Sequence, residues 1–145
     1  MSAKSRSPAL LLDTCAVIWL ATGEALQGDA ADHITYAGLA DGIFVSPISA
    51  WEIGLLSRPK LGRGLTFLPD PATWFARFMA GAGIRSAVFN AEIAVASSFL
   101  PDPIHGDPAD RLLIATARHL GLPIMTRNTK IIAHGAAGHV SVIAC

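Results

Sequence analysis

The chain has 145 residues, of which 52% are hydrophobic and 15% charged. This composition fits one domain with a sizeable buried core and excludes a disordered chain. Eleven basic and eleven acidic residues give a formal net charge of zero, so net charge offers no support for nucleic-acid binding.

The two cysteines, Cys15 and Cys145, are too few for a disulfide framework, and they favour a reducing compartment. Lys4 and Arg6 ahead of Leu10 resemble the start of a secretory signal, but Asp13 interrupts the apolar run that follows. No apolar run reaches the roughly 18 residues of a membrane span. We therefore expect a cytoplasmic protein.

Short apolar runs alternate with helical patterns along the chain. Residues 9–12 are apolar throughout, which is typical of a strand buried on both faces. Further strands are predicted at 43–45, 84–89, 123–126 and 140–143. Helices are predicted at 15–20, 29–39, 48–56, 71–79, 91–99, from Pro108 to near Gly121, and at 128–133. This alternation predicts an α/β fold with a parallel sheet of about four to five strands and helices on both faces. We expect a disordered tail at 1–8 and a single domain at 9–145.

The segment from His105 to Ala117 reads as the beginning of a helix. Asp107 suits the cap position, Pro108 the first helical position, and an apolar run follows. Asp110 comes three residues after Asp107, so both carboxylates lie at the positive end of the helix. The same spacing is close to an ordinary capping box, and it indicates a site only if acids from elsewhere converge on it.

Two other acids are candidates to converge there. Asp13 follows the first strand, at the end of a parallel sheet where ligands bind, although capping the next helix would also explain it. Glu52 falls on a stripe with Ile48 and Leu55 in an otherwise almost wholly apolar helix. A carboxylate there is costly unless it is paired, for example with Arg58, or binds a metal.

The strand at 123–126 brings its following residues to the same sheet edge. The side chains expected to share one pocket are those of Asp13, Glu52, Asp110 and Asn128, with Asp107 beside them. Carboxylates held together raise one another's pKa, and a hard divalent cation, Mg²⁺ or Mn²⁺, would relieve the repulsion. His105 is the nearest histidine, and its proline-rich loop predicts a surface position.

With these residues assembled, the chain resembles the PIN-domain ribonucleases, and among them the VapC-type toxins of bacterial toxin–antitoxin pairs. The segments that match, in the family's order and over almost the whole length, are 10–14, 46–53, 107–115 and 122–128. The resemblance implies that Asp13, Glu52 and Asp110 are metal-binding catalytic acids, with Asp107 as a cap and outer-shell ligand. Asn128 stands where the family often has a fourth acid. Asn128 is therefore a further candidate ligand without charge, and the number of metal ions stays open.

The implied activity is Mg²⁺- or Mn²⁺-dependent hydrolysis of RNA phosphodiester bonds, leaving a 5′-phosphate and a 3′-hydroxyl. Thr14 and Thr126 would position carboxylates, and Arg111 or Arg127 would contact phosphate. Toxins of this kind form homodimers and are inhibited by a small antitoxin protein that covers the site.

Two other hypotheses compete with this one. A PIN-fold module that binds RNA or a protein without cutting is favoured only by Asn128. A haloacid-dehalogenase-like phosphatase would need a second aspartate two residues after Asp13, where Cys15 stands.

Overall fold

The computed structural model describes residues 8–60 and 62–145. In this part of the chain, five short strands form one sheet in the order β3-β2-β1-β4-β5, and every neighbouring pair is parallel. The strands are β1 (Leu10–Leu12), β2 (Ile43–Val45), β3 (Ile84–Ser86), β4 (Ile124–Thr126) and β5 (Val142–Ala144). The predicted α/β fold with a parallel sheet of four to five strands is confirmed.

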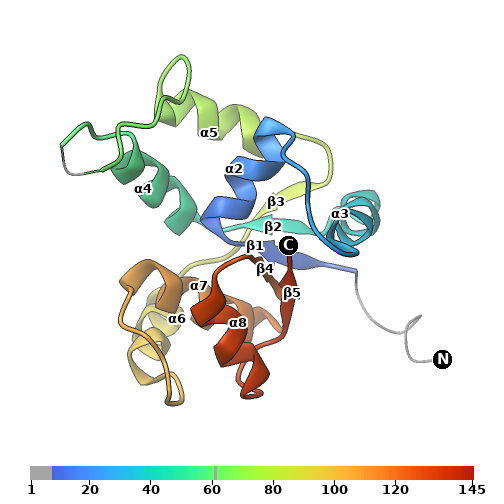
Figure 1. Cartoon of the computed structure of the whole chain (residues 1–145), viewed down its shortest axis with the longest axis vertical. Helices are drawn as coiled ribbons and strands as arrows, with labels where there is room; N and C mark the ends of the chain where they lie inside the picture. The colour runs from blue at the N-terminus through green and yellow to red at the C-terminus, as the bar shows by residue number, and fades with distance from the viewer. Residues whose placement is uncertain (1–7, 61) are drawn as a thin grey trace.

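Helices cover both faces of this sheet (Figure 1). Figure 1 shows α2, α4 and α5 on one side and α6, α7 and α8 on the other. The helices are α2 (Thr14–Thr22), α3 (Ala30–Leu39), α4 (Pro47–Leu56), α5 (Pro71–Met79), α6 (Ala91–Ala96), α7 (Pro108–Leu120) and α8 (Thr129–Ala136), with a 3₁₀ turn, η1, at Ser97–Phe99. None of the helices in the described residues is long and apolar enough to cross a membrane.

The central strand β1 divides the core into two clusters. Successive side chains of a strand point to opposite faces, so Leu10 and Leu12 pack in one cluster and Leu11 in the other. All three are fully buried. This burial on both faces explains why the strand is an unbroken apolar run instead of an alternating one.

The element boundaries differ from the sequence prediction in a few places. The third strand ends at Ser86, three residues before the predicted end, and the last strand begins at Val142, two residues after the predicted start. The predicted helix 91–99 tightens into the 3₁₀ turn from Ser97. The predicted tail at 1–8 lies almost wholly outside the described residues, which begin at Pro8.

Candidate active site

The sheet topology brings Asp13 to the carboxyl end of β4. Leu12 of β1 pairs with Met125 of β4, so the residues that follow these two strands are neighbours. Asp13 is buried, and its Oδ1 accepts a hydrogen bond of 2.8 Å from the amide of Ala16, capping α2. Its Oδ2 accepts one from the hydroxyl of Thr126. Asp13 is thus both a helix cap and a buried acid of the site.

Glu52 reaches the same region from α4, the helix that follows β2. The helix begins at Ser46, whose side chain caps the amide of Ile48 at 3.0 Å. The buried residues of α4 are Ser49 and Ile53, so the predicted apolar stripe through Ile48 and Leu55 is wrong, and Glu52 lies at the edge of the buried face.

The contact that holds Glu52 comes from α2. The hydroxyl of Thr14 donates to Oε1 of Glu52 and lies 3.1 Å from the hydroxyl of Ser49. Arg58 is exposed and forms no ion pair with Glu52 among the described residues. Glu52 therefore faces the acids and not a surface cation.

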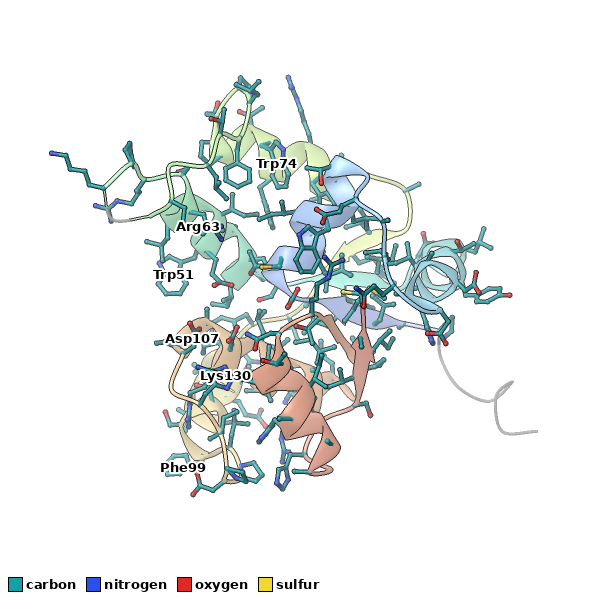
Figure 2. All side chains as sticks on the ribbon, viewed as in Figure 1. Trp51, Arg63, Trp74, Phe99, Asp107 and Lys130 are labelled. Atoms are coloured by element: carbon teal, nitrogen blue, oxygen red, sulfur yellow. The ribbon has the colours of Figure 1, made fainter. Side chains whose placement is uncertain are left out.

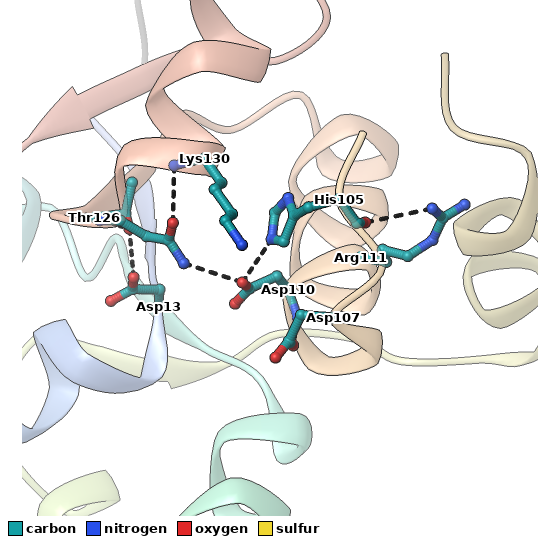
Figure 3. Close-up of polar contacts among 8 residues, drawn as sticks. Asp13, His105, Asp107, Asp110, Arg111, Thr126 and Lys130 are labelled. Carbon is teal, nitrogen blue, oxygen red and sulfur yellow. Dashed lines mark hydrogen bonds and ion pairs between the residues drawn. The ribbon is translucent and has the colours of Figure 1, made fainter. Parts of the chain in front are cut away.

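Asp110 completes the set of acids from the first turn of α7. Its amide donates to Oδ1 of Asp107 at 2.9 Å, so Asp107 is the helix cap that its position predicted. Its own Oδ2 accepts a hydrogen bond of 3.0 Å from the Asn128 amide group and lies 2.7 Å from Nε2 of His105 (Figure 3). The predicted surface position of His105 is wrong, because only 13% of its side chain is exposed.

Asn128 uses both ends of its side-chain amide. The oxygen caps α8 by accepting from the amide of Lys130 at 2.9 Å, and the nitrogen donates to Asp110. The reverse orientation would set the amide oxygen against a carboxylate oxygen, which is repulsive. Because its nitrogen and not its oxygen faces Asp110, Asn128 would have to reorient for its oxygen to bind the same metal ion as Asp110.

Burial and mutual repulsion raise the pKa of all three acids. Desolvation raises the pKa of Asp13 to about 6, against hydrogen bonds from Thr126 and Ala16 that lower it. Desolvation is also the first cause for Glu52 and Asp110, and neighbouring carboxylates add to both shifts. Ionisation of these acids therefore lowers the stability of the folded protein, and a bound cation would offset this loss.

Cys15 lies among these acids and is exposed. Its thiol is nevertheless partly desolvated. Desolvation, followed by the negative charges of Asp13, Glu52 and Asp110, raises its pKa to about 11, while Arg63 lowers it. A thiol with this pKa is protonated at neutral pH and is a poor nucleophile.

The two arginines expected at the phosphate are engaged elsewhere. Arg111 donates to the main-chain carbonyls of Ser97 and His105, at 3.1 and 3.4 Å. Arg127 lies over the ring of Trp19, 3.7 Å from its centroid, and donates to the carbonyl of Cys145 at 3.0 Å. Either side chain would have to leave these carbonyls to reach a phosphate, so phosphate contact by them stays a prediction.

Other basic side chains also point toward this region. Lys130, in the first turn of α8, is exposed, and Figure 3 shows its side chain pointing toward Asp110. In Figure 2, Trp51 and Arg63 project from the α4 side of the molecule, and Asp107 and Lys130 from the side of α7 and α8. Nothing in the sequence pattern around Lys130 indicates this position, which depends on how α8 packs.

The donor set suits a hard divalent cation. All candidate ligands are oxygens, the three acids are partly or wholly desolvated, and no cationic side chain neutralises Asp13 or Glu52 by an ion pair among the described residues. The carboxylates still stand apart: within residues 8–60 and 62–145, no three acidic, histidine or cysteine side chains are close enough to enclose an ion as placed. A surface hollow lies elsewhere, lined by β5, by the residues that precede β1 and β4, and by α3 with the residues before it, and Asp13, Glu52 and Asp110 do not line it.

A model of the PIN domain matches residues 10–136, which is most of the chain. The chain belongs to the PIN domain family. Proteins of this family are generally metal-dependent nucleases, and the matched segment contains Asp13, Glu52 and Asp110. No curated protein sequence matches the chain.

Solved structures with the same PIN fold come from protein complexes. One is a chain of VapBC2 from Rickettsia felis, a complex bound to a DNA fragment from the promoter of the two proteins. It matches with a TM-score of 0.62 at 13% sequence identity, and the match covers 94% of this chain and 98% of that chain. A chain of FitAB bound to the IR36 DNA fragment has a TM-score of 0.54 at 20% identity, with coverages of 93% and 94%. FitAcB from Neisseria gonorrhoeae gives 0.51 at 21% identity, with coverages of 92% and 96%. At these identities the likeness shows the fold alone.

Proposed function

We propose that this PIN domain is a Mg²⁺- or Mn²⁺-dependent endoribonuclease and the toxin of a VapC-type toxin–antitoxin pair. The observation that carries the proposal is that Asp13, Glu52 and Asp110 approach one edge of the sheet, where the charge of a neighbouring carboxylate helps to raise the pKa of each. Three acids from three separate elements are more than helix capping needs. Their oxygens are the ligands that a hard divalent cation prefers, and such a cation would offset the loss of stability that the ionised acids cause.

The chemistry follows from what these residues hold. A divalent cation bound here would neutralise negative charge on a phosphodiester and favour attack by water. Asp13 and Asp110 would bind the cation, and Glu52, steadied by Thr14, would bind it or orient the attacking water. Thr126 fixes Asp13 from the opposite side. Lys130 is the basic side chain that we expect to contact the phosphate.

The family and its structural neighbours support the biological part of the proposal. The similar solved structures are VapBC and FitAB complexes, in which a PIN-fold chain is held by a partner protein. We propose that a small antitoxin protein likewise covers this site, that the chain forms a homodimer, and that it acts on RNA in the cytoplasm.

The test is cleavage of total cellular RNA by the purified protein, with new 5′ ends mapped by sequencing. Reactions contain Mg²⁺ or Mn²⁺, or EDTA, and are repeated with Asp110→Asn, which removes one ligand charge and keeps the shape. Asp32→Asn is the matched control, because Asp32 occupies the first turn of α3 as Asp110 does that of α7, but is exposed and far from the acids in the chain.

We expect new ends only with metal, with the unchanged protein and with Asp32→Asn. Full cleavage by Asp110→Asn would refute the site assignment. If a folded, antitoxin-free protein cuts nothing, the result would favour the other hypothesis, a PIN-fold module that binds RNA or protein without cleaving it. Asn128 in place of a fourth acid supports that hypothesis.

A further inference from the structure

His105 lies in the loop between η1 and α7, five residues before Asp110. Its Nε2 is 2.7 Å from Oδ2 of Asp110, and 87% of its side chain is covered by the rest of the protein. A histidine at this distance from a carboxylate forms a charge-assisted or strongly polarised hydrogen bond. The proposed mechanism gives this residue no task.

The loop that holds His105 is fastened on both sides of it. The Arg111 side chain donates to the carbonyl of His105 at 3.4 Å (Figure 3). It also donates to the carbonyl of Ser97 at 3.1 Å, which ties the loop to η1. Nδ1 of the buried His134 lies 3.0 Å from the carbonyl of Pro103. The imidazole of His105 is therefore held against Asp110 by contacts from η1, α7 and α8, and not by a free surface loop.

The two oxygens of Asp110 are unequally occupied. Oδ2 meets both Nε2 of His105 and the amide nitrogen of Asn128, at 2.7 and 3.0 Å. Oδ1 makes no hydrogen bond with any of the described residues. Rotation of the carboxylate would break both contacts at once, so one oxygen is fixed by the protein and the other is left for a ligand.

The other ring nitrogen of His105 supports this interpretation. Nδ1 is buried and has no hydrogen-bond partner among the described residues. An unpartnered buried polar atom destabilises a folded protein, a cost that an apolar side chain in the same place would not have. The hydrogen bond to Asp110 is what distinguishes histidine from such a side chain here.

We infer that His105 is a positioning residue, which with Asn128 holds Oδ2 of Asp110 so that Oδ1 is presented to the divalent cation. This inference rests on the proposed function. His105 does not itself serve as a ligand in this arrangement, because Nε2 faces Asp110 and Nδ1 is buried. Arg111 then acts on the site through the His105 carbonyl instead of through phosphate.

Binding of Mn²⁺ by the purified full-length protein, measured by calorimetry, tests the inference without depending on cleavage. His105→Ala removes the donor. His105→Gln keeps an amide nitrogen near the place of Nε2, and His105→Asn places it near Nδ1, out of reach of Asp110. His119→Ala is the matched control, because His119 lies on α7, the helix that carries Asp110, and only approaches Glu92, at 3.9 Å. Thermal melts establish that each variant folds.

We expect His105→Ala to weaken Mn²⁺ binding by about tenfold or more, the usual effect of losing a partner of a metal ligand. His105→Gln should restore most of the affinity, whereas His105→Asn should not. In cleavage assays, the metal concentration for half-maximal rate should rise in His105→Ala, and the rate at saturating metal should recover.

Wild-type affinity in a folded His105→Ala variant would overturn the inference and leave the proposed function standing. If that variant does not fold, the test is the comparison of His105→Gln with His105→Asn. Equal affinities of these two variants for Mn²⁺ would overturn the inference. A wild-type protein that binds no Mn²⁺ would overturn the proposed function itself, and the inference with it.

Discussion

Asp13→Asn should make the metal-free protein more stable at neutral pH. Burial raises the pKa of Asp13 from its ordinary 3.8 to about 6. Because a tenfold change in proton affinity corresponds to about 1.4 kcal/mol, the ionised carboxylate costs the folded state about 3 kcal/mol at about pH 7.5. Asparagine has no such charge. It can still cap α2 at Ala16 and can donate to the hydroxyl of Thr126.

The sign of the pH dependence follows from proton binding. Between pH 3.8 and about 6 the folded state keeps a proton on Asp13 that the unfolded state has released, so the free energy of unfolding falls as pH rises. Above this window the whole cost is present, and below it none. Asp13→Asn should therefore gain about 1–3 kcal/mol over wild type at about pH 7.5 and almost nothing at about pH 4.

Urea denaturation in EDTA at these two pH values measures the effect, and Asp70→Asn is the control. Asp70 caps α5 as Asp13 caps α2, but its pKa is lowered by the amide and hydroxyl of Thr73. Its contribution to stability is present at neutral pH and is lost as pH falls, so Asp70→Asn should lower stability at about pH 7.5. An Asp13→Asn variant less stable than wild type in EDTA at neutral pH would refute the reasoning from burial. With Mn²⁺ added, wild type should be stabilised and the variant should not.

Three further outcomes are expected. Thr126→Val removes the hydroxyl that donates to Asp13 and accepts from the main-chain N–H of Asn128. Urea denaturation should show that the free energy of unfolding falls by about 1–3 kcal/mol, and by less once Asp13 is protonated. Leu113→Ala, in the fully buried core on the α7 side, should lose about 2–5 kcal/mol in the same assay, and an unchanged midpoint would contradict the packing. Cys15 should alkylate slowly with iodoacetamide at about pH 8, as followed by mass spectrometry, because its pKa is about 11, and divalent metal should speed the reaction by neutralising the nearby carboxylates.

The fold could be predicted because its signals are local. The run Leu10–Leu12 is buried on both faces, and a helix pattern follows nearly every strand, which leaves a parallel sheet as the simple solution. The strand ends were less certain. Val140 extends the β-branched pattern of Val142 and Ile143 across Ser141, but the ladder with β4 begins only at Val142.

The site acids could be predicted for a topological reason. The carboxyl ends of parallel strands meet at one edge, so Asp13 and the residues after Thr126 had to be neighbours. The prediction for Glu52 rested on the stripe from Ile48 to Leu55, whereas the buried face of α4 runs through Ser49 and Ile53. Its contact with Thr14 depends on how α2 and α4 pack, which spacing within one helix does not encode.

The role of His105 could not be predicted, because it depends on a loop. A proline-rich stretch ordinarily indicates exposed chain. Here the Arg111 side chain and His134 hold that stretch against the body of the protein, through the main-chain carbonyls of His105 and Pro103. Interactions with main-chain atoms leave no residue pattern in the sequence.

The zero net charge of the chain conceals an uneven distribution that bears on how RNA would approach. Asp13, Glu52 and Asp110 concentrate negative charge at one edge of the sheet, where their ionised forms would repel a phosphodiester. The arginines nearest in the chain to these acids, Arg111 and Arg127, are held by main-chain carbonyls and do not neutralise that edge by ion pairs with them. A divalent cation would cancel most of this negative charge, so that metal binding has to come before productive RNA binding. The same carboxylates that destabilise the metal-free fold would then make cleavage conditional on the metal.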